Sequence, residues 1–252
     1  MKEGFKKLQR LEKLWGEVKC LYQDIEKEGG VVNYFRKNCN LDKALLIKDF
    51  SIVCIDEGIP WGGIHLPGSG FLLEETDIEE LKNKIQELKK SGIKIKGVYS
   101  HEGCGAVAKM MKDNNIEGKQ DEIATQKAKE LAEKLGLEYL GHIRLNEMKR
   151  EKDLHNTVFI YYTNLWFNWE KGKFPRGFTI SRNILNKEQA LKDLELAINI
   201  AFSDHGFGEK FTKENPLYIV VLEKDEDNIE KEVENLTKNS ENIRVEVIKV
   251  KD

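Results

Sequence analysis

Two short segments of this 252-residue chain carry side chains that could bind a metal ion. The first is an apolar run that ends on Cys54 and continues to Asp56, and the second ends on His101 and Cys104. Two thiols and an imidazole suit a tetrahedral zinc ion, which leaves a fourth position for water or a carboxylate. The residue types therefore predict a Cys-His-Cys zinc site, with Asp56 as the conditional fourth ligand.

The elements around these segments should bring them together. Alternation and apolar runs predict strands over 50–55 and 93–99, with an amphipathic helix over 77–90 between them. A strand–helix–strand crossover makes the two strands parallel, so both segments lie at carboxyl ends of strands, where open α/β sheets bind ligands. A helix expected over 106–113 places Cys104 near a helix N-terminus, which favours the thiolate.

The chain as a whole is expected to form an α/β fold with a parallel-centred sheet flanked by helices. Residues 1–35 are predicted to form an N-terminal amphipathic helix arm, which would pack on a partner subunit or on its own core. Residues 36–150 would form the zinc-binding α/β core, beginning with an apolar strand at 44–47. Residues 151–252 would add a C-terminal α+β portion, which could also belong to the same domain. No internal sequence repeat is apparent.

Composition excludes several classes of partner. A net charge of -3 and a pI near 6.1 give no electrostatic case for nucleic acid or an anionic membrane. No apolar run approaches the roughly 20 residues of a membrane span, and no signal peptide is visible, so a cytoplasmic location is expected. There the four cysteines are thiols or metal ligands rather than disulfides. Cys20 lies among the apolar positions of the N-terminal helix and Cys39 has no paired ligand nearby, so neither is expected to bind metal.

The two segments resemble the β-class carbonic anhydrases. Cys54-Ile55-Asp56, the glycine-rich turn after it, and Ser100-His101-Glu102-Gly103-Cys104-Gly105-Ala106 are similar to the family's C-x-D-x-R and H-x-x-C-G motifs, over about residues 40 to 115. The resemblance implies a β-carbonic-anhydrase-like fold, with zinc as cofactor and carbon dioxide or bicarbonate as substrate. It also implies that zinc lowers the pKa of its bound water toward about 7 and that the resulting hydroxide attacks carbon dioxide, with Asp56 orienting it.

The first motif is incomplete, because the family's arginine falls here on Gly58. In the family that arginine pairs with the aspartate and holds it off the metal. Without it, Asp56 would ligate the zinc and close the site, unless Arg144 or Arg182 replaced the arginine from elsewhere in the fold. The neighbouring Glu57 adds a negative charge that would raise the pKa of a zinc-bound water.

Other residues near the motifs are secondary candidates. His65 and Gly105 could line the pocket, and Glu102 could shuttle protons or point into solvent. His142 and His155 are not expected to take part in chemistry.

Three alternatives to a carbonic-anhydrase-like lyase remain open. The protein could be a zinc-dependent hydrolase or lyase acting on another small electrophile. It could be a non-catalytic zinc-binding protein in which Asp56 closes the site. In the absence of metal, Cys104 could be a nucleophile assisted by His101. Whichever applies, the N-terminal helix suggests a homodimer or another homo-oligomer.

Overall fold

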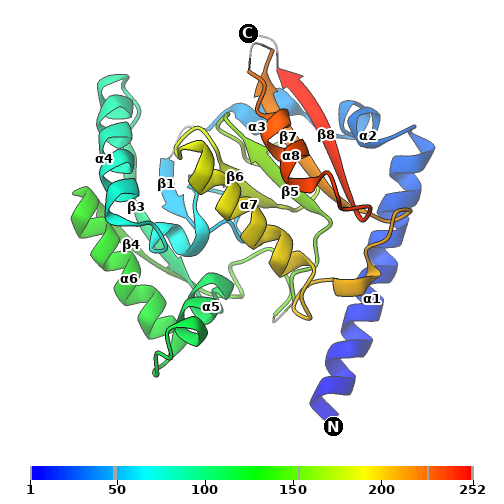
Figure 1. Ribbon diagram of the computed structural model, residues 1–252, viewed down its shortest axis with the longest axis horizontal. Coiled ribbons are helices and arrows are strands. Elements are labelled where there is room, and N and C mark those ends of the chain that lie inside the picture. The colour runs from blue at the N-terminus through cyan, green and yellow to red at the C-terminus, as the bar shows by residue number, and fades with distance from the viewer. Residues whose placement is uncertain (1, 48–49, 153, 226, 251–252) are drawn as a thin grey trace.

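The computed structural model describes residues 2–47, 50–152, 154–225 and 227–250. It shows an α/β protein with two four-stranded sheets flanked by helices (Figure 1). Every pairing in both sheets is parallel. The parallel sheet expected for the first half is confirmed. The expected α+β character of the second half is wrong, because its strands are joined by crossovers and run in one direction.

The first sheet has the strand order β2-β1-β3-β4. Its strands are β1 Phe50–Val53, β2 Gly63–His65, β3 Ile95–His101 and β4 Glu138–Ile143. Its helices are α4 Glu75–Lys90, α5 Gly105–Asp113 and α6 Gln120–Leu135. The central strand β1 is buried along its whole length, which is why its sequence is a continuous apolar run rather than an alternating one. These described elements, within residues 50–143, are called the first unit below.

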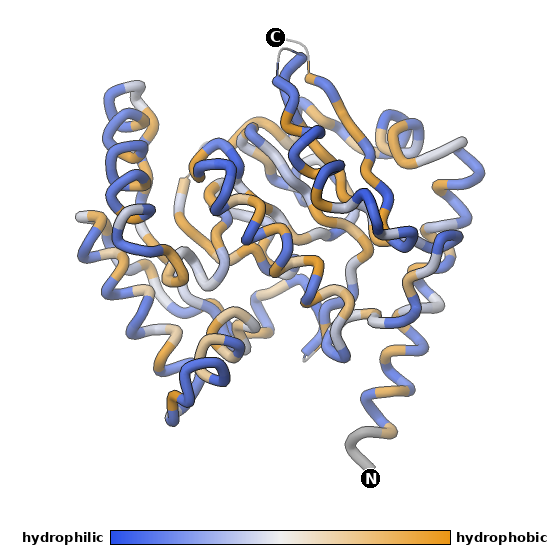
Figure 2. The backbone as a smooth tube through the Cα atoms, in the orientation of Figure 1, coloured by the Kyte–Doolittle hydropathy of each residue, from blue (hydrophilic) through white to orange (hydrophobic). Residues whose placement is uncertain are grey.

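The second sheet has the order β6-β5-β7-β8. Its strands are β5 Phe159–Thr163, β6 Phe178–Ser181, β7 Leu217–Lys224 and β8 Ile243–Val250. Its helices are α7 Lys187–Ala201 and α8 Glu230–Thr237, and a short 3-10 turn, η2, covers Gly208–Lys210. Hydrophobic residues follow the strands of both sheets, where the core lies (Figure 2). These elements, within residues 159–250, are called the second unit.

The two sheets meet where the segments around β2 and β6 lie against each other. The Thr179 N–H of β6 donates to the Ile55 carbonyl at 3.1 Å. The His65 N–H at the end of β2 donates to Ser181 Oγ at 2.8 Å. Backbone groups at the edge of each sheet are thus satisfied by the other unit, so the units are tied together directly beside the first metal-binding segment.

Three helices precede the first sheet: α1 Lys2–Lys27, α2 Val31–Asn38 and α3 Leu41–Leu45. The predicted strand at 44–47 is wrong, because part of that run lies in α3. Asn40 caps this helix by accepting the Lys43 N–H at 2.9 Å, a local signal that outweighs the short apolar run. The glycine-rich stretch 58–70 contains the strand β2 and ends in a 3-10 turn, η1 Pro67–Gly70.

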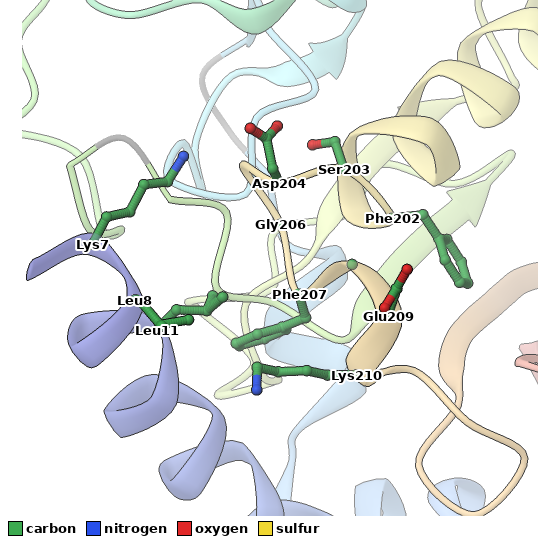
Figure 3. Close-up of a pocket in the computed structure, with 11 residues that line it drawn as sticks. Lys7, Leu8, Leu11, Phe202, Ser203, Asp204, Gly206, Phe207, Glu209 and Lys210 are labelled. Carbon is green, nitrogen blue, oxygen red and sulfur yellow. The ribbon is translucent and has the colours of Figure 1, made fainter. Parts of the chain in front are cut away.

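The predicted amphipathic helix at the N-terminus is confirmed as α1, and it packs on the second unit of its own chain. Trp15 lies edge-on against Phe207, with 4.9 Å between ring centroids. Nearer the N-terminus, Leu8 and Leu11 border a hollow between α1 and the loop around Phe207 (Figure 3). Phe5 and Leu8 are 62% and 53% exposed. The expected homodimer stays a prediction. No helix among the described residues is long and apolar enough to cross a membrane.

Candidate metal centre

The three predicted ligands converge on one point. Cys54 follows the last residue of β1, His101 is the last residue of β3, and Cys104 is the N-cap of α5. Their ligating atoms all lie within 4.8 Å of one another, and all three side chains are buried. The prediction that parallel strand order brings these residues together is confirmed.

The distances suit a metal ion with two thiolate ligands. Cys54 Sγ and Cys104 Sγ are 3.9 Å apart. Tetrahedral coordination with metal–sulfur bonds of about 2.3 Å would place two sulfur atoms about 3.8 Å apart. His101 Nδ1 lies 3.1 Å from the Glu102 carbonyl, so it carries a proton and donates it. This tautomer leaves the buried Nε2 without a hydrogen-bond partner and ready to act as a ligand.

The loop between β3 and α5 is fixed by side chains from α6. Gln120 Nε2 donates to the Cys104 carbonyl at 2.7 Å, and the Gly103 N–H donates to Asp121 at 3.0 Å. The pKa of Cys104 is lowered, first by a hydrogen bond from Cys54 and then by N–H groups in the first turn of α5, although burial opposes the shift. Burial and the same hydrogen bond raise the pKa of Cys54, so Cys104 is the thiol of this pair that loses its proton first.

Asp56 is held in an ion pair with a residue that the sequence pattern did not reveal, Arg150. Arg150 Nε lies 2.8 Å from Oδ1 and 3.1 Å from Oδ2 of Asp56, and both side chains are 3% exposed. The Gly58 N–H also donates to Oδ1, at 2.9 Å. Burial alone would raise the pKa of Asp56, but Arg150 outweighs burial and holds that pKa well below its usual value. Asp56 is therefore ionised, and hydrogen bonds to both of its carboxylate oxygens fix its orientation.

Gly58 makes room for this arginine. A Cβ atom at position 58 would lie 2.9 Å from Arg150 Cγ and 3.0 Å from Met148 Cε. The glycine that replaces the motif's arginine therefore opens the path through which Arg150 reaches Asp56. The suggested replacements are wrong: Arg182 pairs with Glu232 in the second unit, with Nε 3.0 Å from Oε2, and Arg150 rather than Arg144 pairs with Asp56.

A second ion pair neutralises Glu57. Its carboxylate is fully buried, and Oε2 lies 2.7 Å from His155 Nδ1. Burial alone would lower the pKa of His155, but the Glu57 carboxylate outweighs burial and raises it. The negative charge expected at Glu57 is thus balanced by a histidine that the sequence suggested was uninvolved. Both Arg150 and His155 come from the segment that joins the two units.

A cavity of about 500 Å³ lies against this centre. Its lining includes Gly103 and Gly105 on either side of Cys104, together with Arg150 and His155. The rest of the wall includes residues of α5 in the first unit and of α7 in the second, such as Ile200, together with Gln120 of α6 and the loop after α7. The expectation that Gly105 borders a pocket therefore agrees with its position, and the pocket takes residues from both halves of the chain.

The other predicted site residues have structural contacts. His65 is buried behind Cys54, with Nδ1 3.1 Å from the Cys54 carbonyl, and burial lowers its pKa to about 4. Glu102 accepts the Leu145 N–H at 3.0 Å. His142 Nδ1 lies 2.8 Å from Ser100 Oγ, beside the strands rather than in the metal cluster.

No sequence signal marked Arg150 or His155. Arg150 stands in a charged run, Lys149-Arg150-Glu151, that is typical of a solvated loop. His155 precedes β5 without another ligand-type residue beside it. Both are placed in the site by tertiary contacts, at separations of 94 and 98 residues from their partners.

Comparison of the chain with known protein families, with curated proteins and with solved structures found no match. Its function is therefore argued from the fold and the site. Together they define an α/β protein with a buried Cys-His-Cys group that could hold a metal ion, next to a charge-balanced network and a cavity between two units.

Proposed function

We propose that this protein is a zinc-dependent lyase similar to the β-class carbonic anhydrases, which catalyses reversible hydration of carbon dioxide. The observation that carries the proposal is the ion pair between Arg150 and Asp56 beside the Cys-His-Cys group. It supplies from residue 150 the contact that the motif's arginine would make from residue 58. The reason for expecting a site closed by Asp56 is thereby removed.

Zinc is the metal that this donor set favours. Cys54, His101 and Cys104 would hold it, because two thiolates and one imidazole at tetrahedral spacing match zinc sites with one open position. When bound there, zinc would act as a Lewis acid and lower the pKa of a coordinated water toward about 7, which is the chemistry that hydration of carbon dioxide needs.

The protein's own residues would orient the reactants. Asp56 is ionised, and Arg150 and Gly58 fix both of its oxygens in place. A carboxylate fixed in this way can accept a hydrogen bond from the attacking water and set its direction. His155 neutralises Glu57, so the site carries less excess negative charge to repel bicarbonate. Carbon dioxide and bicarbonate would be held in the cavity that Arg150 and His155 line, next to these groups.

Zinc content and a hydration assay test the proposal together. Purified protein should hold about one equivalent of zinc per chain and should hydrate carbon dioxide above background between about pH 6 and 9. Zinc-free protein, or zinc-loaded protein with background rates across this range, would contradict it. The second result would favour a non-catalytic zinc site.

Ligand variants locate the metal. Cys104→Ser and His101→Ala should each lower zinc content well below half an equivalent and abolish hydration, because the remaining donors bind zinc weakly. Cys20→Ser is the matched control, since Cys20 is exposed on α1 and lies outside the cluster. Cys20→Ser should keep both the zinc and the activity of the unmodified chain.

A further inference from the structure

The two units run through the same order of elements. In each sheet the strand that comes first in the chain lies between the second and the third, and the fourth lies at the edge beside the third. The orders are β2-β1-β3-β4 and β6-β5-β7-β8. In each unit helices join the second strand to the third: α4 in the first unit and α7 in the second. Helices also join the third strand to the fourth: α5 and α6 in the first unit and α8 in the second. Strand by strand, β1 corresponds to β5, β2 to β6, β3 to β7 and β4 to β8.

The correspondence extends to the residue that follows the first strand. Val53, the last residue of β1, pairs with the last residue of β2. Thr163, the last residue of β5, pairs with the last residue of β6. Cys54 and Asn164 therefore occupy the same position in the two units, directly after the central strand.

The third strands can be aligned in the same way. Ile52 pairs with Val98 in the first unit. Tyr162 is the last residue but one of β5, as Ile52 is of β1, and it pairs with Val221 in the second unit. Val98 and Val221 are therefore equivalent, and this equivalence sets the register of all that follows.

Counting forward from that pair locates the other ligands. His101 and Cys104 stand three and six residues after Val98. Lys224 and Asp227 stand three and six residues after Val221, and are therefore their counterparts in the second unit. The side chains at the corresponding positions touch, as the thiols of the first unit do: Asn164 Nδ2 donates a hydrogen bond to Asp227 Oδ2. This contact supports the alignment independently of the strand register.

Polar pairs link the strands and helix of the second unit near these strand ends. Arg182 Nε lies 3.0 Å from Glu232 Oε2, and the Tyr162 hydroxyl donates to the same oxygen at 2.9 Å. Lys249 Nζ lies 2.8 Å from Glu223 Oε1, and Glu223 is fully buried. Among the described residues, neither of the two clusters that could hold a metal ion includes a residue of the second unit.

We infer that the second unit is a structural copy of the metal-binding unit that has lost its own metal site. Asn164, Lys224 and Asp227 stand where Cys54, His101 and Cys104 stand in the first unit. The second unit remains as a permanent partner of the first, whose cavity it walls with α7. The inference goes beyond the proposed function, because it concerns the second unit, which contributes none of the three proposed metal ligands.

Restoring the ligands tests the inference. The starting variant is Cys54→Ser/Cys104→Ser, which removes the first site. Adding Asn164→Cys, Lys224→His and Asp227→Cys should restore binding of about one Co²⁺ or Zn²⁺ per chain, because the equivalent positions place two thiols and one imidazole together. Zinc is measured after dialysis, and thiolate ligation is seen as Co²⁺ charge-transfer absorption. Replacing Asn164→Cys by Leu165→Cys shifts the thiol by one residue and is the matched control.

The outcomes are distinct from those for the proposed function. A folded graft that binds no more metal than its parent or than the shifted control would overturn the inference, even if the unmodified chain holds zinc. A graft that binds metal supports it, even if the unmodified chain holds none. Should the graft lose its circular dichroism spectrum, Asn164→Cys/Asp227→Cys alone is oxidised mildly in the same parent. A disulfide between the two introduced cysteines, located by peptide mapping and leaving only the thiols of Cys20 and Cys39 free, supports the alignment. Four free thiols in folded protein contradict it.

Discussion

Arg150 and Asp56 form a buried charge pair on which the candidate site depends. Each side chain is 3% exposed, so neither can regain water if the other is removed. Removing one member of such a pair leaves an uncompensated charge and typically costs about 3–5 kcal/mol. The pair is therefore expected to matter for stability and for the orientation of Asp56, and the two effects can be separated.

Arg150→Gln should lower the free energy of unfolding by about 3 kcal/mol and reduce the rate of carbon dioxide hydration at least about tenfold, with zinc retained. The rate falls because Asp56 is released and can turn to the metal. Urea unfolding, zinc analysis and the hydration assay measure the three quantities. Lys149→Gln is the control, since the Lys149 side chain is half exposed and its Nζ lies 3.3 Å from Glu170 Oε1 at the surface. Full activity in folded Arg150→Gln would contradict the assigned role.

Gly58→Ala tests whether the glycine is needed for the path of Arg150. The added methyl would lie 2.9 Å from Arg150 Cγ and 3.0 Å from Met148 Cε, so Arg150 must shift. We expect a loss of about 1–3 kcal/mol in the free energy of unfolding, together with reduced hydration activity. Gly16→Ala is the control: it lies within α1 with nothing within 4 Å of the added methyl, and should stabilise by up to about 1 kcal/mol. Equal effects of the two changes would contradict the crowding argument.

At the scale of elements, the sequence predicts the part of the site that local patterns encode. The ligands at the ends of β1 and β3 follow from apolar runs, an intervening helix and the handedness of crossovers. Arg150 and His155 do not follow from any pattern, because an ion pair formed 94 residues away depends on how the two units pack. The second parallel sheet was missed for a different reason. β5 and β7 are continuous buried runs like β1, but the described chain between β5 and β6 contains no helix that would have predicted a crossover.

Asp193 on α7 gives a pH-dependent prediction that does not involve the candidate metal ligands. It is 3% exposed, and burial raises its pKa to about 7. Between about pH 4 and 7 the folded state then binds a proton that the unfolded state has lost, so this group's contribution to stability is present at low pH and is lost as pH rises. Asp193→Asn should therefore stabilise the protein above pH 7, by an amount that shrinks toward pH 4. Urea unfolding at several pH values measures this.

The control variant is Glu195→Gln, which changes an exposed carboxyl group on the same helix. If Asp193→Asn gave the same change in stability at pH 4 and at pH 8, the carboxyl group would not titrate as the structure indicates.

At the scale of the molecule, two units with one topology share one site. The repeat is not visible in the sequence because the residues that would identify it, the metal ligands, are replaced in the second unit by Asn164, Lys224 and Asp227. What both units keep is buried apolar strands, which many sequences can supply. The strand order therefore shows the relation between the units where residue identity does not. It explains why the described residues form two sheets of the same order but a single cluster of two thiols and an imidazole.

The two units are expected to unfold together. The helix α1 precedes the first unit in the chain yet packs on the second, where Trp15 contacts Phe207 and Phe211. Trp15→Ala should lower the free energy of unfolding by about 3–5 kcal/mol, because it removes a large buried ring and leaves a cavity. Since hydrogen bonds around β2 and β6 also join the two units, the loss of stability should extend to both units.

Hydrogen–deuterium exchange of peptides from β3 and β7 separates the possibilities. Cooperative unfolding predicts that Trp15→Ala speeds exchange of both core strands by the same factor, of the order of a hundredfold or more for a loss of about 3 kcal/mol. Phe5→Ala removes a ring that is 62% exposed on the same helix and should change neither rate. Faster exchange confined to β7 would mean that the second unit opens alone. It would then be a separable addition to the metal-binding unit and not its fixed partner.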